Sequence, residues 1–205
     1  MMHKFDYWSP TEVMFGKGRE DETAAYVKKY GGSKVLLVYG GGSVERSGLL
    51  QRVKEQLDAA GIGYAEFGGV QPNPTVEYAR EGVKRAIESQ ADFILAVGGG
   101  SAIDTAKGIA HGAANPDVDI WKFWSGEEKV QKSMPVGVIL TISAAGSETS
   151  ASSVLTNKAT GSKRGLDTRV SLKQALAAQG FQGGTRGDTE WSQWVRSETE
   201  QLAAV

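Results

Sequence analysis

Glycine-rich turns are the part of this sequence best suited to chemistry, and two of them share one pattern. Gly98 to Ser101 follows the apolar run ILAV and precedes a helical pattern, and Gly40 to Ser43 follows the run KVLLVY. A turn without side chains exposes its main-chain N–H groups, and the dipole of the following helix adds partial positive charge there. Such a turn binds phosphate or pyrophosphate without a cationic side chain. Both turns are therefore candidate phosphate sites.

The residues after the second turn allow two interpretations. Ser101 is the expected N-cap of the helix, and Asp104 follows at the spacing of a capping box. A structural alternative stays open, because glycine-rich turns also occur in α/β proteins that bind nothing there, and Asp104 can be only a capping residue. Neither common phosphate motif is complete: GxGxxG would need glycine at Ile103, and the Lys-Ser/Thr pair of a P-loop is missing.

The elements that must position these turns alternate between strand and helix. Continuous apolar runs predict buried strands, and spacings of three and four residues predict helices. The predicted strands are 34–39, 64–70, 92–97 and 135–142, and the predicted helices are 47–61, 75–90 and 102–113. In the helix over 75–90 we expect Val76, Ala79, Val83 and Ile87 to face inward. Residues 4–16 suggest an extended hairpin or edge strand, and residues 17–30 a surface helix.

This order predicts an α/β fold with a Rossmann-like, mainly parallel sheet flanked by helices. Two more loops, QPNPT after the second strand and LTISAAGSETS after the fourth, then lie at the same carboxyl edge as the glycine turns. That edge is where such sheets bind ligands. Four polar or glycine-rich loops meeting there favour a nucleotide cleft.

Composition excludes several other functions. The 205 residues have a net charge of −1, which gives no reason to expect nucleic acid or a membrane as partner. The chain has no cysteine and only two histidines, His3 and His111, so disulfides, thiolate chemistry and a histidine-rich metal site are excluded. We expect neither histidine to be functional. No apolar segment is long enough for a membrane helix and the first residues do not resemble a signal peptide, so a cytoplasmic location is expected.

Six motifs together resemble the N-terminal half of the iron-containing (group III) alcohol dehydrogenases, in particular their butanol dehydrogenase branch. They are YWSPTEVMFGKG, VYGGGSVERSG, GVQPNPT, VGGGSAIDTAKGIA, TISAAGSE and SSVLTN, in the family's order over about residues 5–163. The resemblance implies a dinucleotide-binding domain over 1–163, followed in the family by a helical domain that holds iron or zinc through one aspartate and three histidines.

The resemblance also implies roles for individual residues. Gly98, Gly99, Gly100 and Ser101 would cradle the pyrophosphate, and Asp104 would lie near the nicotinamide. The remaining implied cofactor contacts are Gly40, Gly41, Gly42, Ser43, Asn73, Thr141, Ser143, Ser150, Val154 and Lys163.

The first loop bears on the choice of cofactor. NAD-binding members of the family place a carboxylate where it can bond the ribose 2′-hydroxyl, and Gly40 occupies that position here. Glycine leaves room for a 2′-phosphate, Ser43 can donate to it, and Arg46 is near. We therefore predict NADP(H) over NAD(H), with the alternative that Arg46 is only a solvated helix residue.

The metal ligands of the family have no counterpart in this sequence, so the helical metal-binding domain is expected to be absent. Residues 164–205 lie outside the resemblance and predict short helices over 170–178 and 189–204. A natural alternative ending and a frameshifted ending both stay open as the origin of this tail. A homodimer is expected, and a full-length relative is a further candidate partner. Two functions follow: the cofactor-binding domain of an NADP-dependent alcohol dehydrogenase, or a non-catalytic nucleotide-binding or regulatory module.

Overall fold

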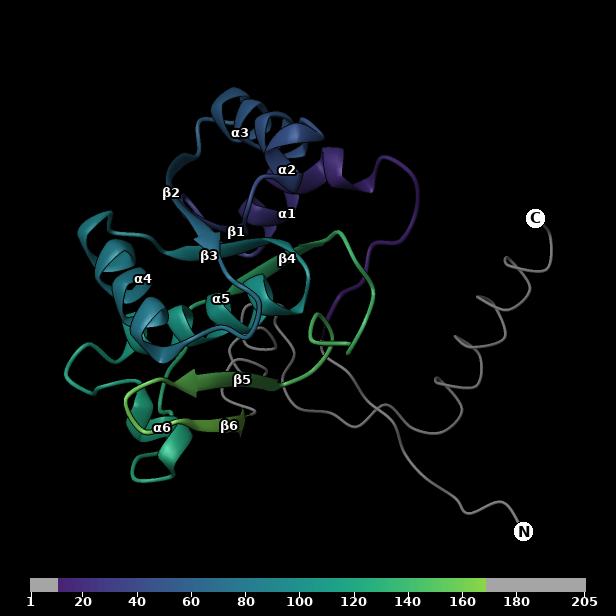
Figure 1. The fold of residues 1–205 in the computed structure, drawn as a ribbon. Coiled ribbons are helices and arrows are strands. Elements are labelled where there is room, and N and C mark those ends of the chain that lie inside the picture. The colour runs from purple at the N-terminus through teal and green to yellow at the C-terminus, as the bar shows by residue number, and fades with distance from the viewer. Residues whose placement is uncertain (1–10, 169–205) are drawn as a thin grey trace, which may run out of the picture.

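A four-stranded parallel sheet forms the centre of the molecule in a computed structural model that describes residues 11–168 (Figure 1). The strands are β1 (Lys34–Gly40), β2 (Gly63–Val70), β3 (Phe93–Gly98) and β4 (Val136–Leu140), in the order β2-β1-β3-β4. All three pairings are parallel, and β1 lies between β2 and β3. The predicted α/β fold is therefore confirmed.

Helices cover both faces of the sheet because its central strands are apolar on both sides. α1 (Thr23–Lys29) and α3 (Leu49–Ala59) pack with Val35 and Leu37 of β1 on one face. α4 (Val76–Glu88) and α5 (Gly100–Ala114) contribute to the opposite core with Leu36 and Val38. These four side chains of β1 are fully buried, which explains why a run without polar residues forms this strand.

Three short helical segments complete this part of the chain: η1 (Arg19–Glu22), α2 (Ser43–Arg46) and α6 (Trp121–Ser125). The surface helix predicted over 17–30 is confirmed as η1 followed by α1. Residues 11–15 form no strand, and the rest of the predicted N-terminal hairpin lies outside the described residues.

Helix ends follow the expected chemistry in two places. Gly61, with φ of 68°, ends α3: its N–H donates to the Asp58 carbonyl at 3.0 Å, and the Ile62 N–H donates to the Leu57 carbonyl at 2.9 Å. This pattern is a Schellman motif, which needs a left-handed residue and therefore favours glycine. At the start of α4 the Thr75 hydroxyl accepts from the Tyr78 N–H.

The helices α4 and α5 approach each other closely through glycine. A Cβ on Gly82 would lie 2.3 Å from Ile109 Cδ1, and one on Gly112 would lie 2.4 Å from Val83 Cγ2. The inward face of α4 is therefore built on small residues, including Ala79, Gly82 and Ala86. The prediction that Ile87 points inward is wrong, because this narrow face leaves Ile87 at its edge with 46% of its surface exposed.

A β-hairpin that the sequence analysis did not predict packs on the outer side of α5. Its strands β5 (Ser152–Asn157) and β6 (Ser162–Asp167) are antiparallel, and Leu155 is buried in a small core with Phe123 and Trp124 of α6 (Figure 1). β6 continues four residues past the boundary predicted at Lys163. The domain division itself stays a prediction, and the helices predicted over 170–178 and 189–204 lie outside the described residues.

Candidate functional site

The glycine loops lie at the point where the chain leaves neighbouring strands in opposite directions. β1 leads through Gly40, Gly41 and Gly42 toward α3 on one face of the sheet. β3, its neighbour, leads through Gly98 and the residues after it into α5 on the other face. Open parallel sheets bind ligands where two such loops diverge. The structure thus brings both predicted glycine loops to one edge.

The N-terminus of α5 presents main-chain groups at this edge. The helix begins at Gly100, with Gly99 as N-cap and no side chain bonded to the cap. The first N–H groups of a helix have no acceptor within it, so they are available to an anion. A Cβ on Gly100 would meet nothing within 4 Å, and Gly98 has φ of 155°, which favours glycine. The prediction that Ser101 is the N-cap is wrong, because the helix starts earlier and Ser101 lies within its first turn.

Asp104 has a different role from the predicted capping box. Its Oδ1 accepts a hydrogen bond from the Ser147 hydroxyl at 2.6 Å, and its Oδ2 accepts from the Val154 N–H at 3.1 Å. Because α5 begins at Gly100, Asp104 faces the segment after β4 instead of the helix start. The carboxylate therefore joins α5 to the loop and to β5.

Lys107, one turn further along α5, is a residue that the sequence analysis missed. Its Nζ donates to the main-chain carbonyls of Ser147, Ser150 and Ser152 at 2.6, 2.9 and 2.7 Å. The available signal was the spacing: a lysine three residues after Asp104 in an otherwise apolar helix shares a face with it.

The environment of Lys107 also affects its charge. Burial lowers the pKa of Lys107 to about 8, while the carboxylates of Asp104 and Glu148 act in the opposite direction.

The loop after β4 runs beside the N-terminus of α5. The Thr141 N–H donates to the Gly98 carbonyl at 3.1 Å, which places Thr141 next to the glycine turn. Ile142 is 68% exposed, and its Cβ lies 3.9 Å from where a Cβ on Gly99 would be. Ser143 and Ser150 are exposed, and Val154 is held by Asp104. Of the four predicted contacts of this segment, Thr141 therefore lies next to Gly98, while Ser150 is bonded to Lys107 and Val154 to Asp104.

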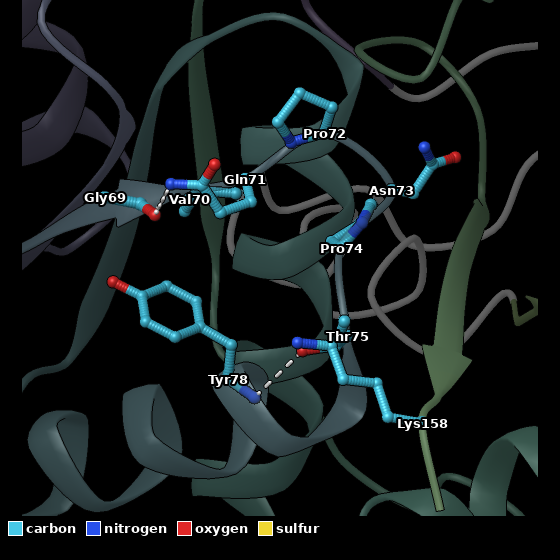
Figure 2. Close-up of a pocket in the computed structure, with 9 residues that line it drawn as sticks. All are labelled: Gly69, Val70, Gln71, Pro72, Asn73, Pro74, Thr75, Tyr78 and Lys158. Atoms are coloured by element: carbon cyan, nitrogen blue, oxygen red, sulfur yellow. Dashed lines mark hydrogen bonds between the residues drawn. The ribbon is translucent and has the colours of Figure 1, made fainter. Parts of the chain in front are cut away.

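Asn73 and Lys163 are brought together from distant parts of the sequence. Lys163 Nζ donates to Asn73 Oδ1 at 2.9 Å. Asn73 has φ of 57° between two prolines, so its backbone is fixed in a left-handed turn. This turn borders a pocket of about 370 Å³ (Figure 2). The pocket is lined by Gly69, Val70, Gln71, Pro72, Asn73, Pro74, Thr75, Tyr78 and Lys158.

The first loop is shaped by Arg46. Gly42 has φ of 44° and precedes the short α2, which begins at Ser43. The guanidinium of Arg46 lies over Gly42: its Nη1 is 2.4 Å from where a Cβ on that glycine would be. At Gly40 a Cβ would meet only the Val70 carbonyl at 3.5 Å, an ordinary contact. The loop therefore has space for a side chain at Gly40 and a cation close by.

The residues present between 11 and 168 do not fit a metal centre, since no three His, Asp or Glu side chains converge there. His111 is 3% exposed, and its Nδ1 has no hydrogen-bond partner in the described structure. Burial lowers the pKa of this imidazole to about 4, and Lys107 adds to the effect. The expectation that His111 has only a packing role stays a prediction, and His3 lies outside the described residues. Among the described helices, none has the length and apolar character needed to cross a membrane.

Comparison with known proteins identifies the family. A family model described as iron-containing alcohol dehydrogenase matches residues 10–176, most of the chain. The chain belongs to this family. The probable NADH-dependent butanol dehydrogenase 1 of Bacillus subtilis is 46% identical over 164 residues, which are 80% of this chain and 42% of that protein. The resemblance inferred from the six motifs is confirmed.

Two further relatives of the family extend the comparison. The NADPH-dependent aldehyde reductase YqhD of Escherichia coli is 38% identical over 165 residues, which are 80% of this chain and 42% of that protein. The crystal structure of an NADH-dependent butanol dehydrogenase A from Thermotoga maritima superposes with a TM-score of 0.79 at 37% identity, over 82% of this chain and 42% of that one. The chain therefore spans about two fifths of the length of these iron-containing alcohol dehydrogenases. Their names include both cofactors, so the preference for NADP(H) stays a prediction.

Proposed function

We propose that this chain binds a nicotinamide dinucleotide at the carboxyl edge of its sheet, with the diphosphate at the N-terminus of α5. The observation that carries the proposal is the position of that terminus: α5 begins at Gly100, directly after β3, where the loops that follow β1 and β3 diverge. Main-chain N–H groups and the helix dipole there can neutralise a diphosphate. The absence of any atom within 4 Å of a Cβ on Gly100 leaves room for the ligand to approach the backbone.

Other predicted residues would hold the remaining parts of the cofactor. Thr141 and Ser143 follow β4 beside Gly98 and would line one side of the cofactor site, while Asn73 and Lys163 would contact its far end. When bound, the reduced nicotinamide would supply the hydride that reduces an aldehyde to an alcohol, and the oxidised ring would accept it in the reverse reaction. This chain's own residues would bind and orient that ring.

We propose NADP(H) as the preferred cofactor. Support comes from the first loop, where Gly40 has no carboxylate and the guanidinium of Arg46 lies over Gly42. A 2′-phosphate carries negative charge, which a nearby guanidinium attracts and a carboxylate would repel. Relatives named as NADH-dependent and as NADPH-dependent both occur, so direct titration has to decide.

The contribution of the chain to catalysis has two candidates. We propose that the chain serves as the dinucleotide-binding part of an alcohol or aldehyde oxidoreductase, by analogy with its full-length relatives. A non-catalytic nucleotide-binding or regulatory module is the second, favoured by the lack of three converging metal-type ligands within 11–168. An alcohol-dependent NADP reduction assay with added iron or zinc distinguishes them.

The homodimer and the cytoplasmic location expected from the sequence also stay predictions. Light scattering measures whether the chain forms a dimer.

Titration calorimetry with NADPH and NADH tests binding directly, and Gly100→Asp is the critical variant. A carboxylate at the first helical position interacts favourably with the helix dipole, so we expect unchanged or higher thermal stability. The same carboxylate repels a diphosphate, so we expect a loss of affinity of at least about ten-fold. Gly63→Asp makes the same change at the exposed amino end of β2 and should bind as the wild type does. Equal binding by wild type and Gly100→Asp would refute the proposed position of the diphosphate.

A further inference from the structure

The segment between β4 and β5 lies at the proposed cofactor site without regular structure of its own. Residues 142–151 are in neither helix nor strand, yet they include Ser150, and Val154 is the third residue of β5, which follows them. Turns within it are few: the Thr149 N–H donates to the Gly146 carbonyl at 3.2 Å, and the Ser150 N–H to the Ser147 carbonyl at 3.4 Å. Such weak local bonding leaves the position of the segment to be decided by contacts with the rest of the fold.

Lys107 supplies most of these contacts. An ammonium group has three donors, and here the carbonyls of Ser147, Ser150 and Ser152 all lie within 2.9 Å of Nζ. Three main-chain oxygens that are at most five residues apart can surround one cation only if the chain turns around it. Hydrogen bonds to a charged group are stronger than neutral ones, so this cation is a strong local constraint.

Asp104 provides a second attachment on the same face of α5. It accepts from the Ser147 hydroxyl and from the Val154 N–H, at the two ends of the segment that Lys107 gathers. One acidic and one basic side chain thus fix both the carbonyls and the donors of the segment. The charges of Asp104 and Lys107 also compensate each other in a partly buried position.

We propose that Lys107 is a positioning residue for the dinucleotide: its ammonium group holds residues 147–152 against α5 and thereby forms one wall of the cofactor site. This inference rests on the proposed function and deepens it. Lys107 itself is turned toward main-chain carbonyls, so it acts through the segment and not by touching the cofactor.

The charge state of Lys107 gives this role a measurable signature. Its lowered pKa of about 8 means that the ammonium begins to lose its proton just above neutral pH, which leaves a weaker donor to the three carbonyls. The titratable groups that act on it are the carboxylates of Asp104 and Glu148, and it acts in turn on the imidazole of His111. β5, which packs against this part of α5, contains no ionisable side chain. Carboxyl groups ordinarily ionise near pH 4 and a nucleotide phosphate near pH 6, both below this range.

The test is a titration of the full chain with NADPH at pH 7 and pH 9.5, for the wild type, Lys107→Met and the control Lys84→Met. Lys84 is exposed on α4, so its replacement removes the same charge without touching the segment. We expect Lys107→Met to bind about ten-fold more weakly at pH 7, and the wild type and Lys84→Met to lose affinity several-fold at pH 9.5. Lys107→Met should show no such loss with pH.

Hydrogen exchange of the amides in residues 147–154 is the second readout and needs no cofactor. Exchange of these amides should be faster in Lys107→Met than in the wild type. In the wild type, raising the pH should accelerate their exchange by more than the intrinsic effect of pH, because Lys107 loses its proton. The amides of the sheet should stay protected in both proteins. If Lys107→Met does not fold, the two wild-type pH series still decide. Wild-type binding that is independent of pH, or equal in Lys107→Met, overturns the positioning role while the proposed function stands. Absence of any wild-type binding overturns the proposed function and this role with it.

Discussion

Gly40 is the residue at which the proposed choice between the two dinucleotides can be tested. It is the last residue of β1, and a Cβ there would meet only the Val70 carbonyl at ordinary distance, so an aspartate fits without displacing the backbone. Arg46 lies close to the same loop, over Gly42. A carboxylate at position 40 would favour NAD by accepting a hydrogen bond from the ribose 2′-hydroxyl. This chain has open space at that position and a cation, Arg46, close by.

Gly40→Asp should reverse the proposed preference for NADP(H). We expect NADPH to lose about ten-fold in affinity relative to NADH, because the new carboxylate repels the 2′-phosphate and can accept from a ribose hydroxyl. Calorimetric dissociation constants for both cofactors measure the ratio. Gly40→Asn is the matched control, since it adds the same volume without charge and should leave the ratio nearly unchanged. A Gly40→Asp variant with the wild-type preference would show that the first loop does not choose the cofactor.

Among the elements, α4 and α5 define how closely helices can pack on this sheet. Gly82 and Gly112 allow side chains of the opposite helix to touch backbone: Ile109 Cδ1 and Val83 Cγ2 would lie within 2.4 Å of an added Cβ. These contacts hold α5 in place, and α5 carries the candidate phosphate site at one end and the anchors Asp104 and Lys107 along its side.

Gly112→Ala should destabilise the protein by about 2 kcal/mol, because the methyl group overlaps Val83 and Ile120 and forces the helices apart. This sign is opposite to that of an exposed helix, where alanine is better than glycine by up to about 1 kcal/mol. Gly100→Ala is the control in the same helix, since nothing lies within 4 Å of its added Cβ and its stability should not fall. Urea unfolding followed by circular dichroism gives both free energies, and equal values for the two variants would contradict the close approach.

The molecule as a whole is held by apolar burial, and His111 is a buried ionisable group that links its stability to pH. The folded protein keeps this imidazole neutral, with its pKa lowered by burial to about 4, whereas the unfolded chain protonates it near pH 6.5. Between these values the unfolded state binds more protons than the folded one. Stability therefore falls as pH drops through this window and is restored as pH rises above it.

His111→Leu should remove this dependence. From pH 7 to pH 5 the wild type is expected to lose about 2 kcal/mol more of its unfolding free energy than the variant does. Carboxyl groups contribute equally in both proteins, so their contribution cancels in this comparison. Because Nδ1 has no partner in the described structure, leucine breaks no side-chain hydrogen bond of that nitrogen. Urea unfolding at both pH values measures the difference, and parallel curves would mean that the pKa of His111 is the same in the folded and unfolded states.

Prediction from sequence worked best where a signal was local and strong. The four sheet strands and the helices α3, α4 and α5 were located from apolar runs and helical spacing. The hairpin of β5 and β6 was missed because SSVLTN and SKRGLD alternate weakly and carry little apolar character. Ile87 was misplaced by one position, because spacing does not show that α4 packs closely through Gly82 and buries Ala86 instead. Ser101 was misplaced by two positions, because the helix begins with glycines that carry no helix-start signal of their own.

The sequence by itself determined the alternation of strands and helices, the glycine turns and the family, because each is encoded in residues that are adjacent along the chain. Only the tertiary structure decided that Lys107 gathers three carbonyls from a segment about 40 residues away, and that Lys163 meets Asn73 across 90 residues. The physical reason is that a hydrogen bond depends on where two groups lie in space, and the packing of α5 against the sheet and hairpin sets those positions. The charge and polarity of each side chain are known from the sequence, but its hydrogen-bond partners are known only from the structure.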